Sequence, residues 1–171
     1  MKYGVALFPS KTLQDVANSY RMRYDSHYSF IPPHVTLREG FELDEKDLPT
    51  IVDQIRSIAS EATPFSLEVY KADTFYPQSN VLFFKIREHE MLTFLYNRLH
   101  EPPFPKNHDY NFVPHVTIGQ DLSQDELFDV LGQLKMKQFH HEELVDRIQL
   151  LYQLENGSWT VYETFLLGKE E

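Results

Sequence analysis

Apolar residues recur along this chain with two different periods, and stretches of the two kinds alternate. Runs rich in β-branched and aromatic residues predict strands at residues 2–8, 33–37, 65–70, 81–86, 114–118, 144–154 and 159–167, with the third run extending toward Phe75. Apolar residues spaced by three and four positions predict helices at about 11–24, 48–58, 91–99 and 127–134. The chain is therefore predicted to mix helices and strands throughout.

Turn and cap residues support several of these boundaries. Ser123 and Glu126 form a capping box, in which each side chain satisfies a free backbone N–H group at a helix start. Asp47 and Pro49 are typical helix-start residues, and they flank the first apolar position of the second helix. Residues 155–158, Glu-Asn-Gly-Ser, predict a turn that joins the last two strands.

One tetrapeptide, Pro-His-Val-Thr, occurs twice, at residues 33–36 and 114–117. The two histidines are 81 positions apart, and an aliphatic residue follows each copy. The order strand, helix, motif strand, helix, strand repeats at about the same offset, which indicates an internal duplication. We predict one two-lobed domain with repeats at about 1–78 and 79–171, in which the last strand has no counterpart in the first half. The competing interpretation is an ordinary chain of alternating helices and strands.

Side chains alternate between the two faces of a strand. His34 and Thr36 are therefore predicted to share one face of the first motif strand, while Val35 and Leu37 share the other. The second copy, residues 115–118, repeats this arrangement. Each motif strand is thus expected to bury aliphatic side chains and to present an imidazole beside a hydroxyl.

Length and composition narrow the class of protein. With 171 residues, 42% of them hydrophobic, the chain is long enough to build a core of its own. It has no cysteine for disulfides or thiolate chemistry, and no apolar segment long enough to cross a membrane. The first apolar run is too short for a signal peptide and ends at Pro9, which favours a cytoplasmic location. A net charge of −10 argues against extended nucleic-acid binding, but not against a small phosphate ester in a locally basic cleft.

The paired motifs resemble those of the two-histidine (2H) phosphoesterases, the superfamily of bacterial RNA 2',5'-ligase-like proteins and cyclic nucleotide phosphodiesterases. The signature of that family is a His-x-Thr/Ser-aliphatic motif in each half, present here at 34–37 and 115–118. The compact length and the prolines before each motif resemble its YjcG-like branch. The resemblance implies an α+β fold of two pseudo-symmetric lobes, each an antiparallel-dominated sheet backed by helices, with the motifs lining a central groove.

The resemblance further implies a metal-independent phosphoesterase without a cofactor, acting on a 2',3'-cyclic phosphate or a 2'-5' phosphodiester. Such a reaction needs a base for the attacking water and an acid for the leaving oxygen, and imidazole can serve as either near neutral pH. The family pattern makes His34 the proton donor and His115 the acceptor, an order that the residues themselves do not fix. Thr36 and Thr117 can donate hydrogen bonds to the non-bridging phosphate oxygens.

Residues near the motifs are further candidates. Arg38 is predicted on the face of His34, where it can bind phosphate, and the alternative is an exposed arginine in a salt bridge. The second motif has Gly119 at the matching position, so it offers no symmetric arginine. Residues in the segments before the motifs can rim the groove or simply face solvent: Arg21, Arg23, Tyr24, His27, Tyr28, Lys106, His108 and Tyr110. The histidines outside the motifs, at 89, 100, 140 and 141, are predicted on the surface.

Other functions are compatible with the same motifs. A zinc site is one, although neither motif supplies the further histidine, cysteine or carboxylate ligands that zinc needs. RNA 2',5'-ligation is another, and the acidic charge counts against it because two RNA ends must be held. A third is a non-catalytic module whose groove binds nucleotides or a partner protein. The expected partner is a small phosphate ester or an RNA terminus, and neither a membrane nor a particular oligomeric state is predicted.

Overall fold

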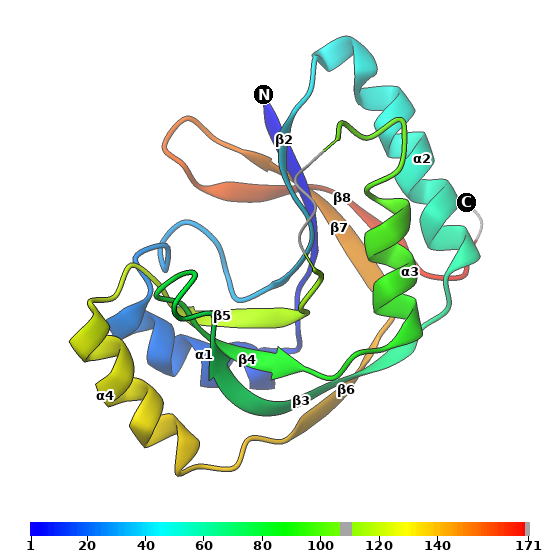
Figure 1. Ribbon diagram of the computed structural model, residues 1–171. Helices are drawn as coiled ribbons and strands as arrows, with labels where there is room; N and C mark the ends of the chain where they lie inside the picture. The colour runs from blue at the N-terminus through cyan, green and yellow to red at the C-terminus, as the bar shows by residue number, and fades with distance from the viewer. Residues whose placement is uncertain (107–110, 170–171) are drawn as a thin grey trace.

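The computed structural model of the protein describes residues 1–106 and 111–169. Its elements are β1 (Lys2–Leu7), α1 (Lys11–Tyr24), β2 (Val35–Glu42), a 3-10 turn (Glu45–Asp47), α2 (Leu48–Glu61), β3 (Phe65–Thr74), β4 (Leu82–Ile86), α3 (Glu90–Arg98), β5 (His115–Gly119), α4 (Gln124–Lys135), β6 (His141–Val145), β7 (Arg147–Gln153) and β8 (Trp159–Leu166). Within these residues the strands form one curled sheet in the order β6-β3-β4-β5-β2-β1-β7-β8 (Figure 1). All neighbouring strands are antiparallel, so the predicted α+β class is confirmed.

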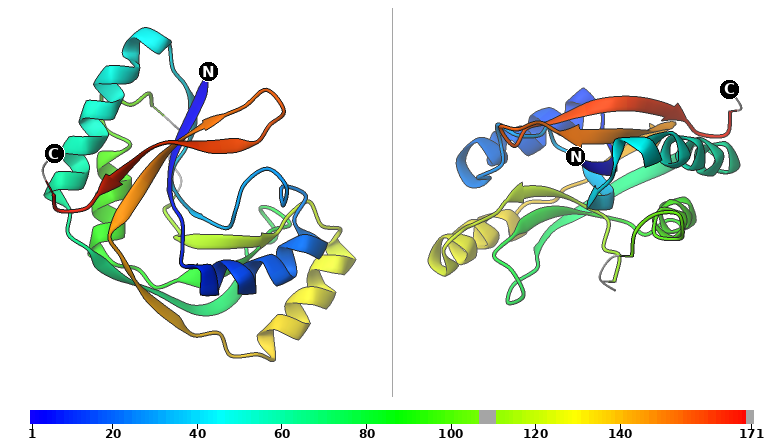
Figure 2. Two further views of the ribbon diagram at one scale, coloured as in Figure 1. Left: turned by 180° about the vertical axis from the view of Figure 1, so that it is seen from behind. Right: turned by 90° about the horizontal axis from the view of Figure 1, so that it is seen from above.

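The sheet divides at its centre into two four-stranded lobes (Figure 2). Among the described residues, the single ladder pair Val35–Val116 joins β2 to β5. In one lobe α3 packs against β2 and α2 against β8; in the other α1 packs against β5 and α4 against β3. Helices thus back each lobe, as the family resemblance implies.

Each lobe combines elements from both halves of the sequence. The third strand, β3, pairs with β4 rather than with a strand of its own half, and β7 pairs back with β1. The order β3-β4-β5 on one side therefore corresponds to β7-β1-β2 on the other. This exchange sets the two motif strands side by side at the centre of the sheet.

Burial in the motif strands follows the predicted alternation. Val35 and Leu37 are 0% and 1% exposed, whereas Thr36 between them is half-buried. The predicted serine cap is also present, because the Ser123 Oγ accepts a hydrogen bond of 3.1 Å from the Glu126 backbone N–H. None of the helices in the described part of the chain combines the length and the apolar character needed to cross a bilayer.

The predicted strand at 144–154 is wrong. The chain there forms two strands, and β6 pairs with β3 in one lobe while β7 pairs with β1 in the other. The change of lobe falls at Asp146, between Val145 and Arg147. The charged residues Asp146 and Arg147 interrupt the apolar pattern between the buried Val145 and Ile148, but a local interruption does not reveal a change of lobe.

Candidate active site

The register of the two central strands brings the motifs together. Val35 and Val116 are direct partners in the antiparallel pair of β2 and β5. In the described residues this is the one ladder pair between the two strands; His34 and Thr36 flank it in one chain segment, and His115 and Thr117 flank it in the other. Because strand side chains alternate, these four side chains lie on the face opposite the two buried valines.

Two cavities open along this face and share part of their lining. A cavity of about 490 Å³ is lined by His34, Thr36 and Thr117, together with residues from β1 and α1. A second cavity, of about 730 Å³, is lined by His115 and again by Thr36. Glu39 also lines both cavities. The histidines therefore line adjoining cavities that meet at Thr36.

Both imidazoles are held in the same way. The His34 Nδ1 lies 2.8 Å from the Pro32 carbonyl oxygen, and the His115 Nδ1 lies 2.6 Å from the Val113 carbonyl oxygen. A carbonyl can only accept, so each Nδ1 carries a hydrogen and donates it. This fixes the tautomer of the neutral rings and leaves Nε2 as the nitrogen that can accept or deliver a proton.

The two rings have different surroundings. His115 packs against Phe75 and Phe83, with ring centroids 5.0 and 5.1 Å away, and burial lowers its pKa below the usual 6.5. Burial also lowers the pKa of His34, to about 4, and the positive charge of Arg21 adds to the effect. Both imidazoles are consequently neutral at pH 7 in the free protein.

Comparison with known proteins identifies the family. The sequence model described as "2'-5' RNA ligase superfamily" matches residues 8–157, which include both motifs. This chain belongs to that superfamily. A protein of Halalkalibacterium halodurans named "Putative phosphoesterase BH1439" is 72% identical over 171 residues, which cover 100% of both chains. A Geobacillus sp. (strain WCH70) protein with the same description is 57% identical over 171 residues, 100% of this chain and 99% of the relative.

Solved structures of low sequence identity share the fold. TT0787 of Thermus thermophilus is 18% identical with a TM-score of 0.68, and the match covers 100% of both chains. E. coli LigT complexed with 3'-AMP is 16% identical with a TM-score of 0.70, over 98% of both chains. The family model confirms the predicted 2H superfamily and these structures confirm its two-lobed fold, while the YjcG-like branch stays a prediction.

Arg38 is buried, which the sequence did not indicate. Its side chain lines the first cavity but is 2% exposed, so the alternative of an exposed, salt-bridged arginine is wrong. The terminal nitrogens donate to the carbonyl oxygens of Leu99 at 3.4 Å and Pro105 at 2.8 Å. The buried Nε has no hydrogen-bond partner among the described residues. Arg38 thus holds the segment after α3, and its buried Nε–H remains without a partner among the described residues.

The position that matches Arg38 in the second motif, Gly119, is tightly packed. A Cβ at Gly119 would lie 3.1 Å from the Tyr24 Cβ and 3.3 Å from the Tyr24 carbonyl oxygen. The end of α1 therefore occupies the space that a larger side chain would need. Arg38 links its strand to the segment after α3 through its side chain. In the second motif the backbone makes the corresponding link to the end of α1, because the Gln120 N–H donates to the Tyr24 carbonyl at 2.9 Å.

The residues predicted to rim the groove behave differently from one another. Arg21 and His27 line the first cavity, and Arg21 is 2% exposed, so it is not the ordinary solvated residue of the alternative interpretation. Tyr28 is 41% exposed and Lys106 is exposed. His108 and Tyr110 lie outside the described residues.

Several cavity residues were not predicted. Trp159 of β8 lines the first cavity, and the second is lined by the stacked rings of Tyr96 and Phe112, whose centroids are 4.3 Å apart. His100, predicted on the surface, is half-buried, lines the second cavity and bonds the Tyr96 carbonyl oxygen at 2.6 Å. His89 was likewise predicted on the surface, but its Nδ1 caps α3 by accepting from the Met91 N–H. None of these residues stands in a recognisable motif, so the sequence gives no signal for them.

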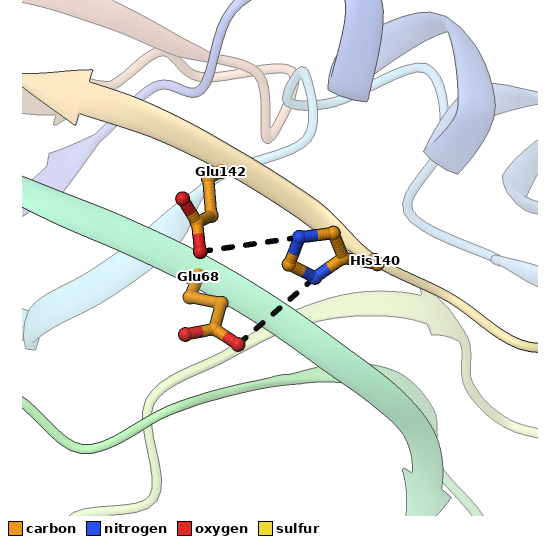
Figure 3. Close-up of side chains that lie close together, drawn as sticks. All are labelled: Glu68, His140 and Glu142. Carbon is orange, nitrogen blue, oxygen red and sulfur yellow. Dashed lines mark ion pairs between the residues drawn. The ribbon is translucent and has the colours of Figure 1, made fainter.

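In the described part of the chain, one cluster of metal-ligand side chains lies at β3 and β6 rather than on the motif strands; Figure 3 shows its three residues. Ligand atoms lie within 4.8 Å of one another on Glu68 of β3, Glu142 of β6 and His140, which directly precedes β6. His140 and Glu142 are exposed, and the Arg87 Nε lies 3.1 Å from a Glu68 oxygen, where it already balances that charge. This cluster shares no residue with the motifs, so it gives no support to a zinc site at the histidines.

Proposed function

We propose that this protein is a phosphoesterase that opens a 2',3'-cyclic phosphate or cleaves a 2'-5' phosphodiester, with His34 and His115 as a metal-independent acid–base pair. The names of the two relatives support phosphoester hydrolysis in general. The E. coli LigT structures include complexes with phosphate and with 3'-AMP, which supports a phosphate-bearing ligand at a fold of this kind. The choice of a 2',3'-cyclic phosphate or a 2'-5' phosphodiester as the bond cleaved is our proposal and goes beyond these names.

The matched hydrogen bonding of the two histidines supports the proposal most directly. Both Nδ1 atoms donate to a carbonyl oxygen two residues earlier, so both rings keep Nε2 for proton transfer. Two rings fixed alike, on adjacent strands and beside two hydroxyls, suit a reaction with one proton transfer on each side of phosphorus.

In the proposed reaction, one neutral imidazole takes a proton from water as the water oxygen forms a bond to phosphorus. The bond between phosphorus and the 2' or 3' oxygen breaks, and the second histidine, protonated at the start, gives its proton to that oxygen. Thr36 and Thr117 donate hydrogen bonds to the non-bridging oxygens, where negative charge is concentrated in the transition state. Arg38 can add a donor through its Nε–H.

The low pKa of His34 bears on which histidine acts as the acid. A group whose pKa is about 4 is neutral at pH 7 in the free protein, and that form accepts rather than donates a proton. The family pattern, with His34 as donor, therefore requires the bound phosphate anion to raise the His34 pKa in the complex. We keep the family assignment, with His115 as the acceptor, on this condition.

A turnover assay with nucleoside 2',3'-cyclic phosphates in the presence of EDTA tests the proposal. We expect hydrolysis by the wild-type chain and losses of roughly 10²–10⁴-fold in His34→Ala and His115→Ala, the usual value of one positioned proton donor or acceptor. His140→Ala is the matched control, because His140 is exposed and belongs to neither motif. Joining of RNA ends in place of hydrolysis would favour ligation. Nucleotide binding without turnover would favour a non-catalytic module, and loss of activity in EDTA would contradict the metal-independent mechanism.

A further inference from the structure

The C-terminal end of α1 contains a buried ion pair that takes no part in the proposed proton transfers. The Arg21 Nε lies 3.0 Å from an Asp25 carboxylate oxygen, and the two side chains are 2% and 3% exposed. A buried ion pair seldom stabilises a protein more than an apolar pair of the same size, because both charges lose their hydration. The position of this pair beside the motif histidines points to a role other than packing.

Arg21 also holds the segment that leads into the first motif. One terminal nitrogen donates to the Ile31 carbonyl oxygen at 2.5 Å, and the other donates to the Asn18 side chain at 2.7 Å. The next carbonyl along the chain, that of Pro32, accepts the hydrogen bond from the His34 Nδ1. The guanidinium therefore fixes the backbone directly before the carbonyl that orients the imidazole.

Asp25 makes the corresponding link to the second motif. One of its carboxylate oxygens accepts from the Gln120 side chain at 2.7 Å and from the His27 backbone N–H at 2.8 Å. Asp25 and Gln120 also form a parallel backbone bridge, just after β5 ends. Gln120 follows Thr117 by three residues, so the carboxylate holds the far end of the second motif strand.

We propose that Arg21 and Asp25 are positioning residues of the active site, which keep the two motifs in register by holding Ile31 before the first and Gln120 after the second. The pair bridges the segment before β2 and the segment after β5, which are far apart in the sequence. Its catalytic consequence rests on the proposed function, whereas its effect on His34 is measurable without any turnover.

The pair also has an electrostatic effect on the first motif histidine. After burial, the charges that act on His34 are those of Arg21 and His115, which lower its pKa, and of Asp25, which raises it. The other titratable or charged side chains lining the same cavity are His27, Arg38 and Glu39. Loss of Arg21 and loss of Asp25 should therefore move the His34 pKa in opposite directions, which a purely structural ion pair remote from the site would not do.

NMR titration of the His34 ring in the full-length chain tests this. We expect Arg21→Met to raise the His34 pKa, Asp25→Asn to lower it and Arg21→Lys, which keeps the charge, to leave it close to the wild-type value. Arg56→Met is the matched control, since Arg56 is a helix arginine of α2 with ion pairs to Asp53 and Glu163. It should not change the His34 titration.

Turnover of a cyclic phosphate separates charge from position. Arg21→Lys should lower kcat/KM by roughly 100-fold even though the His34 pKa stays close to its wild-type value, because a lysine lacks the planar fork that reaches Asp25 and Ile31 together. A folded Arg21→Met with unchanged His34 pKa and unchanged kcat/KM would overturn the proposal. If Arg21→Met does not fold, the His34 titration and kcat/KM of Arg21→Lys and Asp25→Asn test the proposal instead. Failure of the wild-type chain to turn over any cyclic phosphate would count against the proposed function, and the titration would still decide the role of the pair.

Discussion

Val35 of β2 and Val116 of β5 are direct ladder partners, and both side chains are 0% exposed. This pair lies at the junction of the two lobes, on the face opposite the motif histidines and threonines. The same two residues thus join the lobes and set the register of the polar side chains. Packing on one face and the geometry of the candidate site on the other depend on one contact.

Truncation at this junction should reduce stability. We expect Val35→Ala and Val116→Ala each to lower the free energy of unfolding by about 2 kcal/mol, from the lost transfer free energy and the cavity left behind. The double variant should lose less than the sum, because the residues occupy neighbouring positions and share the cavity. Urea unfolding monitored by circular dichroism measures all three values. Strict additivity would show that the two valines do not act together.

The pH dependence of turnover should reflect the lowered pKa values of both motif histidines. The limbs of kcat/KM report the free enzyme, in which the pKa of His34 is about 4 and that of His115 is below 6.5. We therefore expect a bell whose maximum lies on the acidic side of pH 6.5, with limbs that belong to the pair rather than to either residue. The kcat profile should lie at higher pH, because a bound phosphate anion stabilises imidazolium. A flat profile between pH 5 and 9 would contradict acid–base catalysis by these residues.

The threonines should affect rate without affecting titration. Thr36→Ala and Thr117→Ala remove a hydroxyl donor to the phosphate, so kcat should fall while the pH of maximal kcat/KM stays nearly in place. Thr36 lines both cavities and Thr117 one, which makes Thr36 the more sensitive position. Steady-state kinetics at several pH values measures both quantities. A displaced optimum with an unchanged maximal rate would assign the hydroxyls to tuning the histidines instead.

Arg38 should matter for stability as well as for anion binding. Arg38→Met keeps the stem of a side chain whose guanidinium carbon lies 5.0 Å from the Phe41 ring centroid, but removes the two hydrogen bonds to the Leu99 and Pro105 carbonyls. We expect a loss of about 2 kcal/mol in unfolding free energy, the usual range for hydrogen bonds from a charged group. Arg87→Met is the control, since Arg87 is 57% exposed and its ion pair is of the surface kind. Phosphate titration of the folded variant then tests the Nε–H, and equal affinities would limit Arg38 to its structural role.

The sequence predicted the elements and the motif residues well because both depend on local signals. Helix 11–24 matches α1, and Val35 and Leu37 are buried as their alternation predicts, although β2 begins at Val35, after His34, and runs on to Glu42. What could not be predicted depends on contacts between distant segments. The change of lobe at Asp146, the burial of Arg38 against the segment after α3 and the space that Tyr24 takes from position 119 all follow from tertiary packing.

The pairing of α1 with the second motif illustrates the same limit. Arg21 and Asp25 fit the helical pattern and its end, and nothing local distinguishes them from surface residues. Only the exchange of helices between the lobes, which sets α1 against β5, brings Asp25 to Gln120. Spacing within one repeat carries no information on such an exchange.

Stability should fall in acid partly because of His34. Its pKa is about 4 in the folded protein and near 6.5 in the unfolded chain. The unfolded chain therefore binds a proton that the folded protein excludes, so the contribution of His34 is fully present above pH 6.5 and is lost as the pH falls toward 4. At one pKa unit per 1.36 kcal/mol this loss is at most about 3 kcal/mol. His34→Gln should flatten the dependence of unfolding free energy on pH between 6.5 and 4, as measured by urea unfolding in a pH series. Parallel curves for the wild type and His34→Gln would show that the His34 ring does not contribute to the loss of stability in acid.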